Sequence, residues 1–362
     1  MIEIARLDDL EPLARARVDT VTFDYIAGGA DDERTMQENI DSYRQLHLVP
    51  RVLVDVSQRD TATTVLGTAI SMPLLIAPMA FQGLVHPEAE LATARAAAAA
   101  GTIMVASTMS NCSLEAIAEA AGPRWFQLYV YRDRAITRML VERAVAAGYS
   151  ALCVTVDTPL AGHRERDIRN RFTLPAHLKL ANFAGTSRAI IPAVADDSGI
   201  AAYIAKQWDP SLTWKDIEWF ASLSKLPIVV KGILSPLDAR LAIQHGAAAI
   251  VVSNHGGRRL DTVPPAITQL PSIIAAVGDR CEVLLDGGIR RGTDLLKALA
   301  LGAKAVLLGR PILWGLALDG QAGVEAVLQT IHTEFDHALA LAGCPRVAAI
   351  TGALVEQGWA RS

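Results

Sequence analysis

The sequence predicts a single α/β domain built as a parallel (β/α)8 barrel, a TIM barrel, and three observations support this fold class. Short apolar segments alternate with helical patterns along most of the chain. Glycine recurs where a helix ends and the next apolar segment begins. Eight apolar strand candidates can be counted, which is the number that closes such a barrel. They lie near residues 74–77, 103–106, 125–129, 152–156, 228–231, 249–253, 282–286 and 305–309.

Helix-start signals place the connecting helices. Pro87 precedes an alanine-rich segment, and proline suits a first helical turn because its missing N–H would be unpaired there. Ser235 is an N-cap followed by proline, and Ser113 and Thr213 also precede helical patterns. After the third strand, the helix starts only near Asp133. A doubly wound sheet is the alternative fold, but no G-x-G-x-x-G follows the first strand.

Two segments extend the repeat. Residues 1–70 form an N-terminal extension, helical to about Ala30, in which residues 46–70 are consistent with a small antiparallel excursion. Residues 159–212 separate the fourth strand from its helix, and an insertion of this length predicts a lid. We expect one domain over residues 1–362.

The composition narrows the functional class. Charged residues are 20% and hydrophobic residues 51% of the 362 residues, and the net charge is −4, which predicts a substantial core and no nucleic-acid footprint. The apolar runs are too short to span a bilayer, and residues 1–20 do not resemble a signal peptide. The four cysteines lack disulfide or metal-ligand spacing. We expect a cytoplasmic protein with free thiols, without a metal, and without a nucleic-acid or membrane partner.

Polar side chains gather where the strands end, and barrels of this class carry their active sites at that rim. The segment 253–261 contains His255, which can carry a proton at neutral pH, and Arg258, which can hold a carboxylate through two parallel hydrogen bonds. A base beside an anion clamp suggests chemistry on a small acid. A surface turn with a solvated basic patch is the alternative that this segment alone leaves open.

The remaining strand ends predict a phosphate site and two charged groups of the reaction centre. Asp286, Gly288 and Arg290 follow the seventh strand and Gly309 and Arg310 follow the eighth, where barrels commonly bind phosphate.

A lysine at a strand end, here Lys231, is either a Schiff-base amine or a fixed positive charge. Asp157 is the natural carboxylate to orient His255.

Four sequence blocks occur together and in order: 125–129 (WFQLY), 155–159 (TVDTP), 253–258 (SNHGGR) and 285–292 (LDGGIRRG). With them the chain resembles, over essentially its whole length, the FMN-dependent α-hydroxy acid oxidase and dehydrogenase family. The resemblance implies that FMN is the phosphorylated ligand and that the protein is a homotetramer. It also implies that hydride passes from the substrate α-carbon to flavin N5.

The resemblance implies a role for each candidate residue. His255 takes the proton of the α-hydroxyl, Asp157 stabilises the resulting imidazolium, and Tyr129 bonds the hydroxyl as it becomes a carbonyl. Arg164 and Arg258 hold the substrate carboxylate with the help of Tyr25, and Lys231 lies near flavin N1. The implied cofactor-binding residues are Ala80, Ser107, Gln127, Thr155, Lys231, Ser253, Asp286, Gly288, Arg290, Gly309 and Arg310.

The substrate pocket departs from the family pattern. Met109 stands where glycolate enzymes carry tryptophan, Met79 replaces a threonine, and His163 replaces an arginine beside Arg164. Methionine is flexible and apolar, so the pocket is expected to be roomier and to favour lactate or a larger 2-hydroxy acid over glycolate. Both methionines could equally be core packing. Ala80 favours an oxidase, because some dehydrogenases of the family have glycine there.

The expected function is oxidation of an (S)-2-hydroxy acid to the 2-keto acid, with O2 as electron acceptor and H2O2 as product. A dehydrogenase that passes electrons to a quinone or carrier is the first alternative. A barrel enzyme that uses Lys231 as a Schiff base and a catalytically silent flavin scaffold are weaker alternatives.

Overall fold

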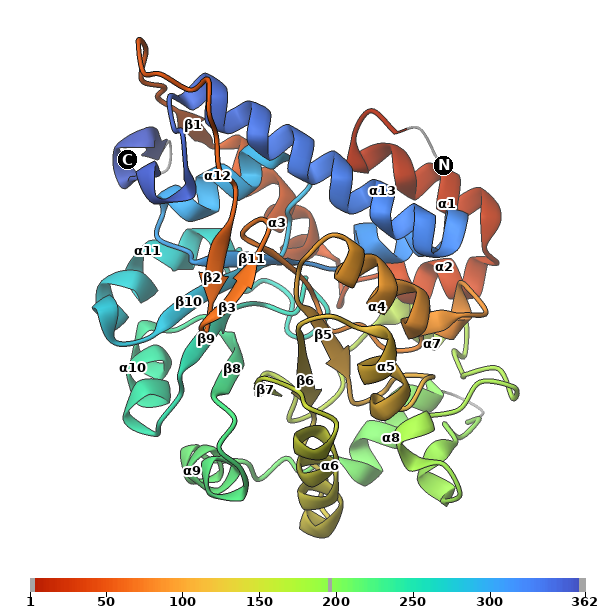
Figure 1. The fold of residues 1–362 in the computed structure, drawn as a ribbon. Coiled ribbons are helices and arrows are strands. Elements are labelled where there is room, and N and C mark those ends of the chain that lie inside the picture. Colours follow the sequence, from red (N-terminus) through yellow and green to blue (C-terminus); the bar gives the residue numbers. More distant parts are fainter. Residues whose placement is uncertain (1–3, 195–196, 358–362) are drawn as a thin grey trace.

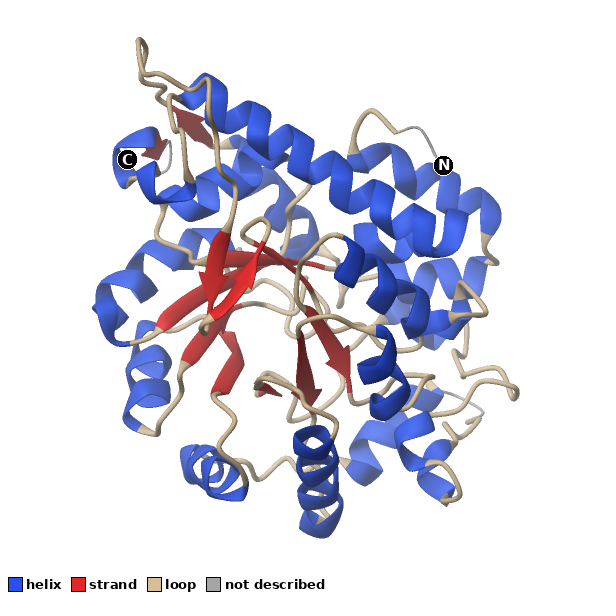
Figure 2. Cartoon of the chain, viewed as in Figure 1, coloured by secondary structure: helices blue, strands red, loops and turns tan. Residues whose placement is uncertain are grey.

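The computed structural model describes residues 4–194 and 197–357. Within them, eight parallel strands close into a barrel in the order β10-β11-β4-β5-β6-β7-β8-β9, which confirms the predicted fold class. Figures 1 and 2 show the strands at the centre and the helices around them. The strands are β4 (Leu74–Ile76), β5 (Met104–Ser107), β6 (Arg124–Leu128), β7 (Leu152–Thr155), β8 (Ile228–Ile233), β9 (Ala249–Val252), β10 (Glu282–Asp286) and β11 (Ala305–Leu308).

Alternate residues of each strand belong to two different cores. One core includes Val105, Trp125 and Val229, which face the barrel interior, and the other includes their neighbours in sequence, which face the helices. The two-stranded hairpin of β2 (Thr63–Val65) and β3 (Thr68–Ile70) adds its apolar residues to the interior core. The amide of Leu66 in its turn donates to the Glu282 carboxylate at the start of β10. The hairpin therefore covers the amino-terminal end of the barrel and leaves the carboxyl end for a site.

The connecting helices begin at the predicted caps. The side chains of Ser113, Asp133 and Ser235 each accept a hydrogen bond from an amide of the helix that follows, and Thr213 forms a capping box. The prediction for Pro87 was wrong. Helix α4 begins at Ala89 with Glu88 as its N-cap, so Pro87 lies before the helix and not in its first turn. The helices are α4 (Ala89–Ala99), α5 (Leu114–Ala120), α6 (Arg134–Ala146), α9 (Trp214–Leu223), α10 (Pro236–Gln244), α11 (Ala266–Val277), α12 (Gly292–Ala300) and α13 (Arg310–Ala342).

The N-terminal extension is helical as predicted, with η1 (Leu7–Asp9), α1 (Leu10–Arg17), α2 (Thr20–Ala27) and α3 (Arg34–Arg44). Helix α13 packs along α1, and its two halves meet at a break at Asp319 and Gly320 (Figure 1). The antiparallel expectation for residues 46–70 holds only in part. The hairpin β2–β3 lies within it, but β1 (Leu46–Leu48) pairs with the distant strand β12 (Val355–Gln357).

The insertion 159–212 contains two helices, α7 (Glu165–Arg169) and α8 (Gly199–Gln207), and the short 3₁₀ helices η3 (Ala181–Phe183) and η4 (Ser187–Ala189). Its apolar side chains Phe172, Ile204 and Trp208 are buried. Gly162, near the start of the insertion, packs closely against the loop after β9. A Cβ at this position would lie only 2.1 Å from the Arg258 carbonyl oxygen, so the contact requires glycine. The insertion therefore covers the carboxyl end of the barrel, as a lid would. No helix in the described ranges is long and apolar enough to cross a membrane.

Candidate active site

A cavity opens at the carboxyl end of the barrel, beneath the insertion. Most of the predicted site residues line it: Tyr25, Ala80, Ser107, Met109, Tyr129, Thr155, Arg164, Lys231, His255, Arg258, Asp286, Gly288, Arg290, Gly309 and Arg310. Three more, Gln127, Asp157 and Ser253, lie directly behind this wall and hydrogen-bond to residues on it. The structure thus brings together residues that the sequence separates by hundreds of positions.

His255 and Asp157 form a hydrogen-bonded pair. His255 Nδ1 donates to the carboxylate oxygens of Asp157 at 3.0 and 3.1 Å. The backbone of His255 has a left-handed φ of 60°, and its amide donates to the Ser253 hydroxyl at 3.0 Å, which fixes the ring relative to β9. Burial, followed by the charges of Arg259 and Lys231, lowers the pKa of His255 below its usual value, although Asp157 opposes this. The imidazole is therefore neutral at pH 7 and can accept a proton at Nε2.

Lys231 is a fixed charge in a buried cluster. Its Nζ lies 2.6 Å from Asp286 Oδ2 and donates to the Ser253 hydroxyl at 2.8 Å. Burial lowers the pKa of Lys231, but Asp286 and Asp157 outweigh it and raise the pKa above the usual value. Asp286 Oδ1 is buried without a hydrogen-bond partner among the described residues, so the carboxylate retains an acceptor.

Amide and hydroxyl groups line the wall next to this cluster. Gln127 Nε2 donates to the Thr155 hydroxyl at 3.0 Å, and Ser107 donates to Gln127 Oε1 at 3.3 Å. Thr155 also pairs with Lys231 in the register of β7 and β8. These contacts hold the polar side chains in a fixed arrangement at the cavity wall.

Two guanidinium groups lie beside the ring of Tyr25. The Cζ atoms of Arg164 and Arg258 are each 5.2 Å from the centre of its ring, and Phe172 stacks on it at 4.2 Å. Arg258 Nη1 donates to the carbonyl oxygens of Tyr25, Ile26 and Gly28, and Arg164 pairs with Asp167 at 2.8 Å. Burial, and then the charge of Arg164, lowers the pKa of Arg258 to about 10. Two crowded cations beside a phenol form a natural carboxylate site.

A second cationic end of the cavity is formed by Arg290 and Arg310. Arg310 donates to the carbonyl oxygens of Ile26, Gly256 and Gly28 at 3.0–3.1 Å. Burial, followed by Arg258 and Arg290, lowers the pKa of Arg310 to about 9.

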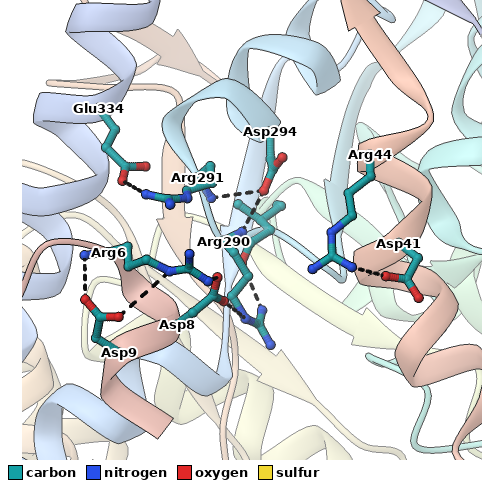
Figure 3. A network of polar contacts seen from close by, with 10 residues as sticks. Arg6, Asp8, Asp9, Asp41, Arg44, Arg290, Arg291, Asp294 and Glu334 are labelled. Carbon is teal, nitrogen blue, oxygen red and sulfur yellow. Dashed lines mark hydrogen bonds and ion pairs between the residues drawn. The ribbon is translucent and has the colours of Figure 1, made fainter.

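The Asp294 carboxylate accepts from the amide of Arg290, whose Nε lies 3.7 Å from Asp8 Oδ1, and Figure 3 shows this surrounding network. Gly288 has a φ of 80°, and a Cβ there would lie 2.0 Å from the Asn39 carbonyl oxygen. Gly309 borders the cavity, and a Cβ there would meet nothing closer than 3.9 Å. This end has excess positive charge and bare backbone, which suits a phosphate.

Sequence reasoning missed several residues of the cavity. Arg259 lines it, and its Nη2 donates to His255 Nε2 at 3.3 Å. Trp208 of the insertion stacks on Tyr129 at 3.9 Å, and Ile200, Ile204 and Leu313 complete an apolar wall with Met79 and Met109. The position of Arg259 next to Arg258 was the one available signal. The others come from the insertion and α13, whose packing over the barrel no local pattern indicated.

Within the described residues, no group of three or more His, Cys, Asp or Glu side chains could hold a metal ion. The polar groups of the cavity are instead suited to an anionic organic ligand. A family model described as FMN-dependent dehydrogenase matches residues 14–357. The chain belongs to this family. It is therefore an FMN-dependent enzyme.

Known proteins similar to the chain include oxidases with three named substrates. An L-lactate oxidase from Nostoc sp. is 55% identical over 346 residues, which cover 94% of this chain and 95% of that protein. Glycolate oxidase 3 from Arabidopsis thaliana is 49% identical over 359 residues, covering 99% and 97%. A crystal structure of mandelate oxidase with (S)-4-hydroxymandelic acid superposes with a TM-score of 0.94, at 44% identity and with 98% of both chains covered.

Proposed function

We propose that this FMN-dependent dehydrogenase family member is an (S)-2-hydroxy acid oxidase, which forms the 2-keto acid and uses O2 as electron acceptor with H2O2 as product. One observation carries the proposal: the His255–Asp157 pair borders the same cavity as the Tyr25, Arg164 and Arg258 group. A base and a carboxylate clamp are the two protein functions that oxidation of a 2-hydroxy acid needs. The similarity to three oxidases and the alanine at position 80 support O2 as the acceptor.

The cavity fits FMN at both ends. Arg290, Arg310 and the backbone at Gly288 and Gly309 would hold the phosphate, because they supply the unneutralised positive charge and close backbone that this group needs. Ala80, Ser107, Thr155 and Lys231 would hold the ring, and Gln127 and Ser253 would support them from behind the wall. Asp286 Oδ1, which has no hydrogen-bond partner among the described residues, would provide an acceptor for the part of FMN that joins the ring to the phosphate. When bound, FMN supplies the two-electron acceptor of the reaction.

The side chains of the chain then perform the proton and carboxylate chemistry. His255 Nε2 takes the proton of the α-hydroxyl, and Asp157 stabilises the imidazolium that forms. Arg164 and Arg258 bind the carboxylate, and Tyr25 beside them helps to fix its orientation. Tyr129, held by the stack on Trp208, bonds the substrate oxygen; burial raises its pKa, so it remains a donor at neutral pH.

The substrate is lactate or a larger 2-hydroxy acid. The lining of the cavity also includes the apolar side chains of Met79, Met109, Ile204, Trp208 and Leu313, two of which are flexible thioethers. A polar wall would be needed to select a substrate with a polar side chain. The apolar wall favours an acid with a methyl or larger apolar group.

Lys231 is unsuited to Schiff-base chemistry. A nucleophilic lysine needs a lowered pKa, whereas Asp286 at 2.6 Å and Asp157 keep this one protonated. A fixed positive charge beside the cofactor ring is the role that its surroundings support. The homotetramer and the cytoplasmic location stay predictions.

Anaerobic mixing with a panel of 2-hydroxy acids, followed by admission of air, tests the proposed function. We expect the flavin absorbance to bleach with lactate or a larger acid and to recover rapidly in air as H2O2 forms. Slow recovery in air with rapid recovery on a quinone or carrier would replace the oxidase by a dehydrogenase. A flavin that no acid bleaches would contradict the proposal and leave a flavin scaffold.

A further inference from the structure

Arg259 is a charged residue of the cavity to which the proposed function assigns no role. It follows Arg258 in the loop after β9, but its side chain does not join the Tyr25 group. Its Nη2 lies 3.3 Å from His255 Nε2, and its Nε is buried without a hydrogen-bond partner among the described residues. The lid segment at Gly162 lies against the backbone of Arg258 and Arg259, so this loop has little freedom to shift.

The hydrogen bond between Arg259 and His255 determines which nitrogen carries the proton. A guanidinium has only donors, so Nε2 must accept and must be unprotonated. Nδ1 then carries the hydrogen that it donates to Asp157. The imidazole is thus held neutral, in the tautomer whose free electron pair faces the cavity.

The charges around His255 determine how strongly this form is favoured. Asp157 favours the imidazolium, whereas Arg259 and Lys231 disfavour it. Of these two cations, Lys231 is neutralised by Asp286 at 2.6 Å. The charged groups that act on the ring are Asp157 after β7, Lys231 on β8 and Arg259 after β9. The other charged or titratable groups that line the cavity are Tyr25 on α2, Tyr129 after β6, Arg164 before α7, Arg258 after β9, Asp286 and Arg290 at and after the end of β10, and Arg310 after β11.

We propose that Arg259 is a positioning residue that occupies His255 Nε2 in the free enzyme and keeps the imidazole neutral until the substrate hydroxyl replaces it there. The inference rests on the proposed role of His255 as the base. The hydroxyl of the incoming substrate donates to the same electron pair on His255 Nε2, so it displaces Arg259. It then meets an imidazole that is already deprotonated and oriented toward the cavity. Arg259 thereby extends the reaction to lower pH.

Arg259→Gln, which removes the charge, tests the inference against Arg259→Lys, which keeps it. Arg44→Gln is the matched control, since Arg44 is 71% exposed on α3 and pairs only with surface Asp41 among the described residues. Two quantities are measured on the FMN-loaded enzyme: the acid limb of kcat/KM against pH, and the titration of the His255 ring by NMR without substrate. Loss of a nearby cation raises a histidine pKa, so both should move to higher pH in Arg259→Gln, by up to about one unit.

In Arg259→Gln we expect the acid limb of kcat/KM and the titration of the His255 ring to move to higher pH. In Arg259→Lys both should stay close to wild type, and in Arg44→Gln both should be unchanged. The flavin absorbance should be equal in all variants. An unmoved acid limb and ring titration in Arg259→Gln would overturn the inference, as would an equal shift in Arg44→Gln. The ring titration separates this inference from the proposed function. If no 2-hydroxy acid bleaches the wild-type flavin, the proposed function fails, and the role of Arg259 is still decided by the NMR shift.

Discussion

The two ends of the cavity handle their charges differently. At the substrate end, His255 and Arg164 have carboxylate partners in the protein, Asp157 and Asp167, whereas Arg258 donates to backbone carbonyls. At the phosphate end, Arg310 is bound only to backbone carbonyls and a thioether among the described residues. A substrate binds and leaves in each turnover, so its site must be stable when empty. A resident phosphate can itself be the counter-charge, and the phosphate end is built to receive one.

Asp157→Asn should produce the largest effect at the substrate end. The amide cannot stabilise an imidazolium and favours the wrong tautomer of His255, so the rate of flavin reduction should fall by about 10³- to 10⁴-fold. Anaerobic stopped-flow absorbance measures this rate. FMN affinity should stay within a few-fold of wild type, and a large loss of FMN would show that the two ends are not separate.

Arg310→Gln should produce the corresponding effect at the phosphate end. Removal of a buried cation that faces a phosphate should weaken FMN binding by about 100-fold, as measured by flavin fluorescence titration. At saturating FMN the rate of flavin reduction should be close to wild type. Unchanged affinity for FMN with equal affinity for riboflavin would contradict this assignment.

Met109→Trp should change the substrate preference by about tenfold. The larger indole would reduce the space for the substrate side chain in the cavity, so kcat/KM for mandelate should fall relative to that for lactate. The ratio between the two acids is its own control, because a general folding defect would lower both. An unchanged ratio would make Met109 a core residue, as its 3% exposure also allows.

Asp8→Asn should produce the smallest effect, and in the opposite direction. Asp8 Oδ1 lies 3.7 Å from Arg290 Nε (Figure 3), so it would compete with a bound phosphate for this guanidinium. Its side chain is 35% exposed, so loss of its charge should tighten FMN binding by only about two- to fivefold. Asp9→Asn is the control, because Asp9 shares the contact with Arg6. Equal changes of FMN affinity in the two variants would show that the contact between Asp8 and Arg290 does not affect FMN binding.

The sequence predicted the parts of the molecule that local patterns encode. All eight barrel strands follow from short apolar runs, and the caps at Ser113, Asp133 and Ser235 from single polar residues. Every predicted site residue lies on the cavity or directly behind it. Those at strand ends meet because parallel strands bring their ends to one rim, whereas Tyr25 comes from α2 and Arg164 from the insertion.

Contacts between distant segments could not be predicted in the same way. The stack of Trp208 on Tyr129 depends on how the insertion folds back over the barrel. The pairing of β1 with β12 joins residues near both ends of the chain. The separation of Arg259 from its neighbour Arg258 depends on two side-chain directions in one loop, which sequence spacing does not specify.

The most direct test of the account is anaerobic mixing of His255→Ala with the acid that bleaches the wild-type flavin. We expect a yellow protein with FMN affinity close to wild type, and a flavin absorbance that the acid leaves unchanged on the timescale of wild-type reduction. Reduction at the wild-type rate would show that His255 is not the base and would contradict the account.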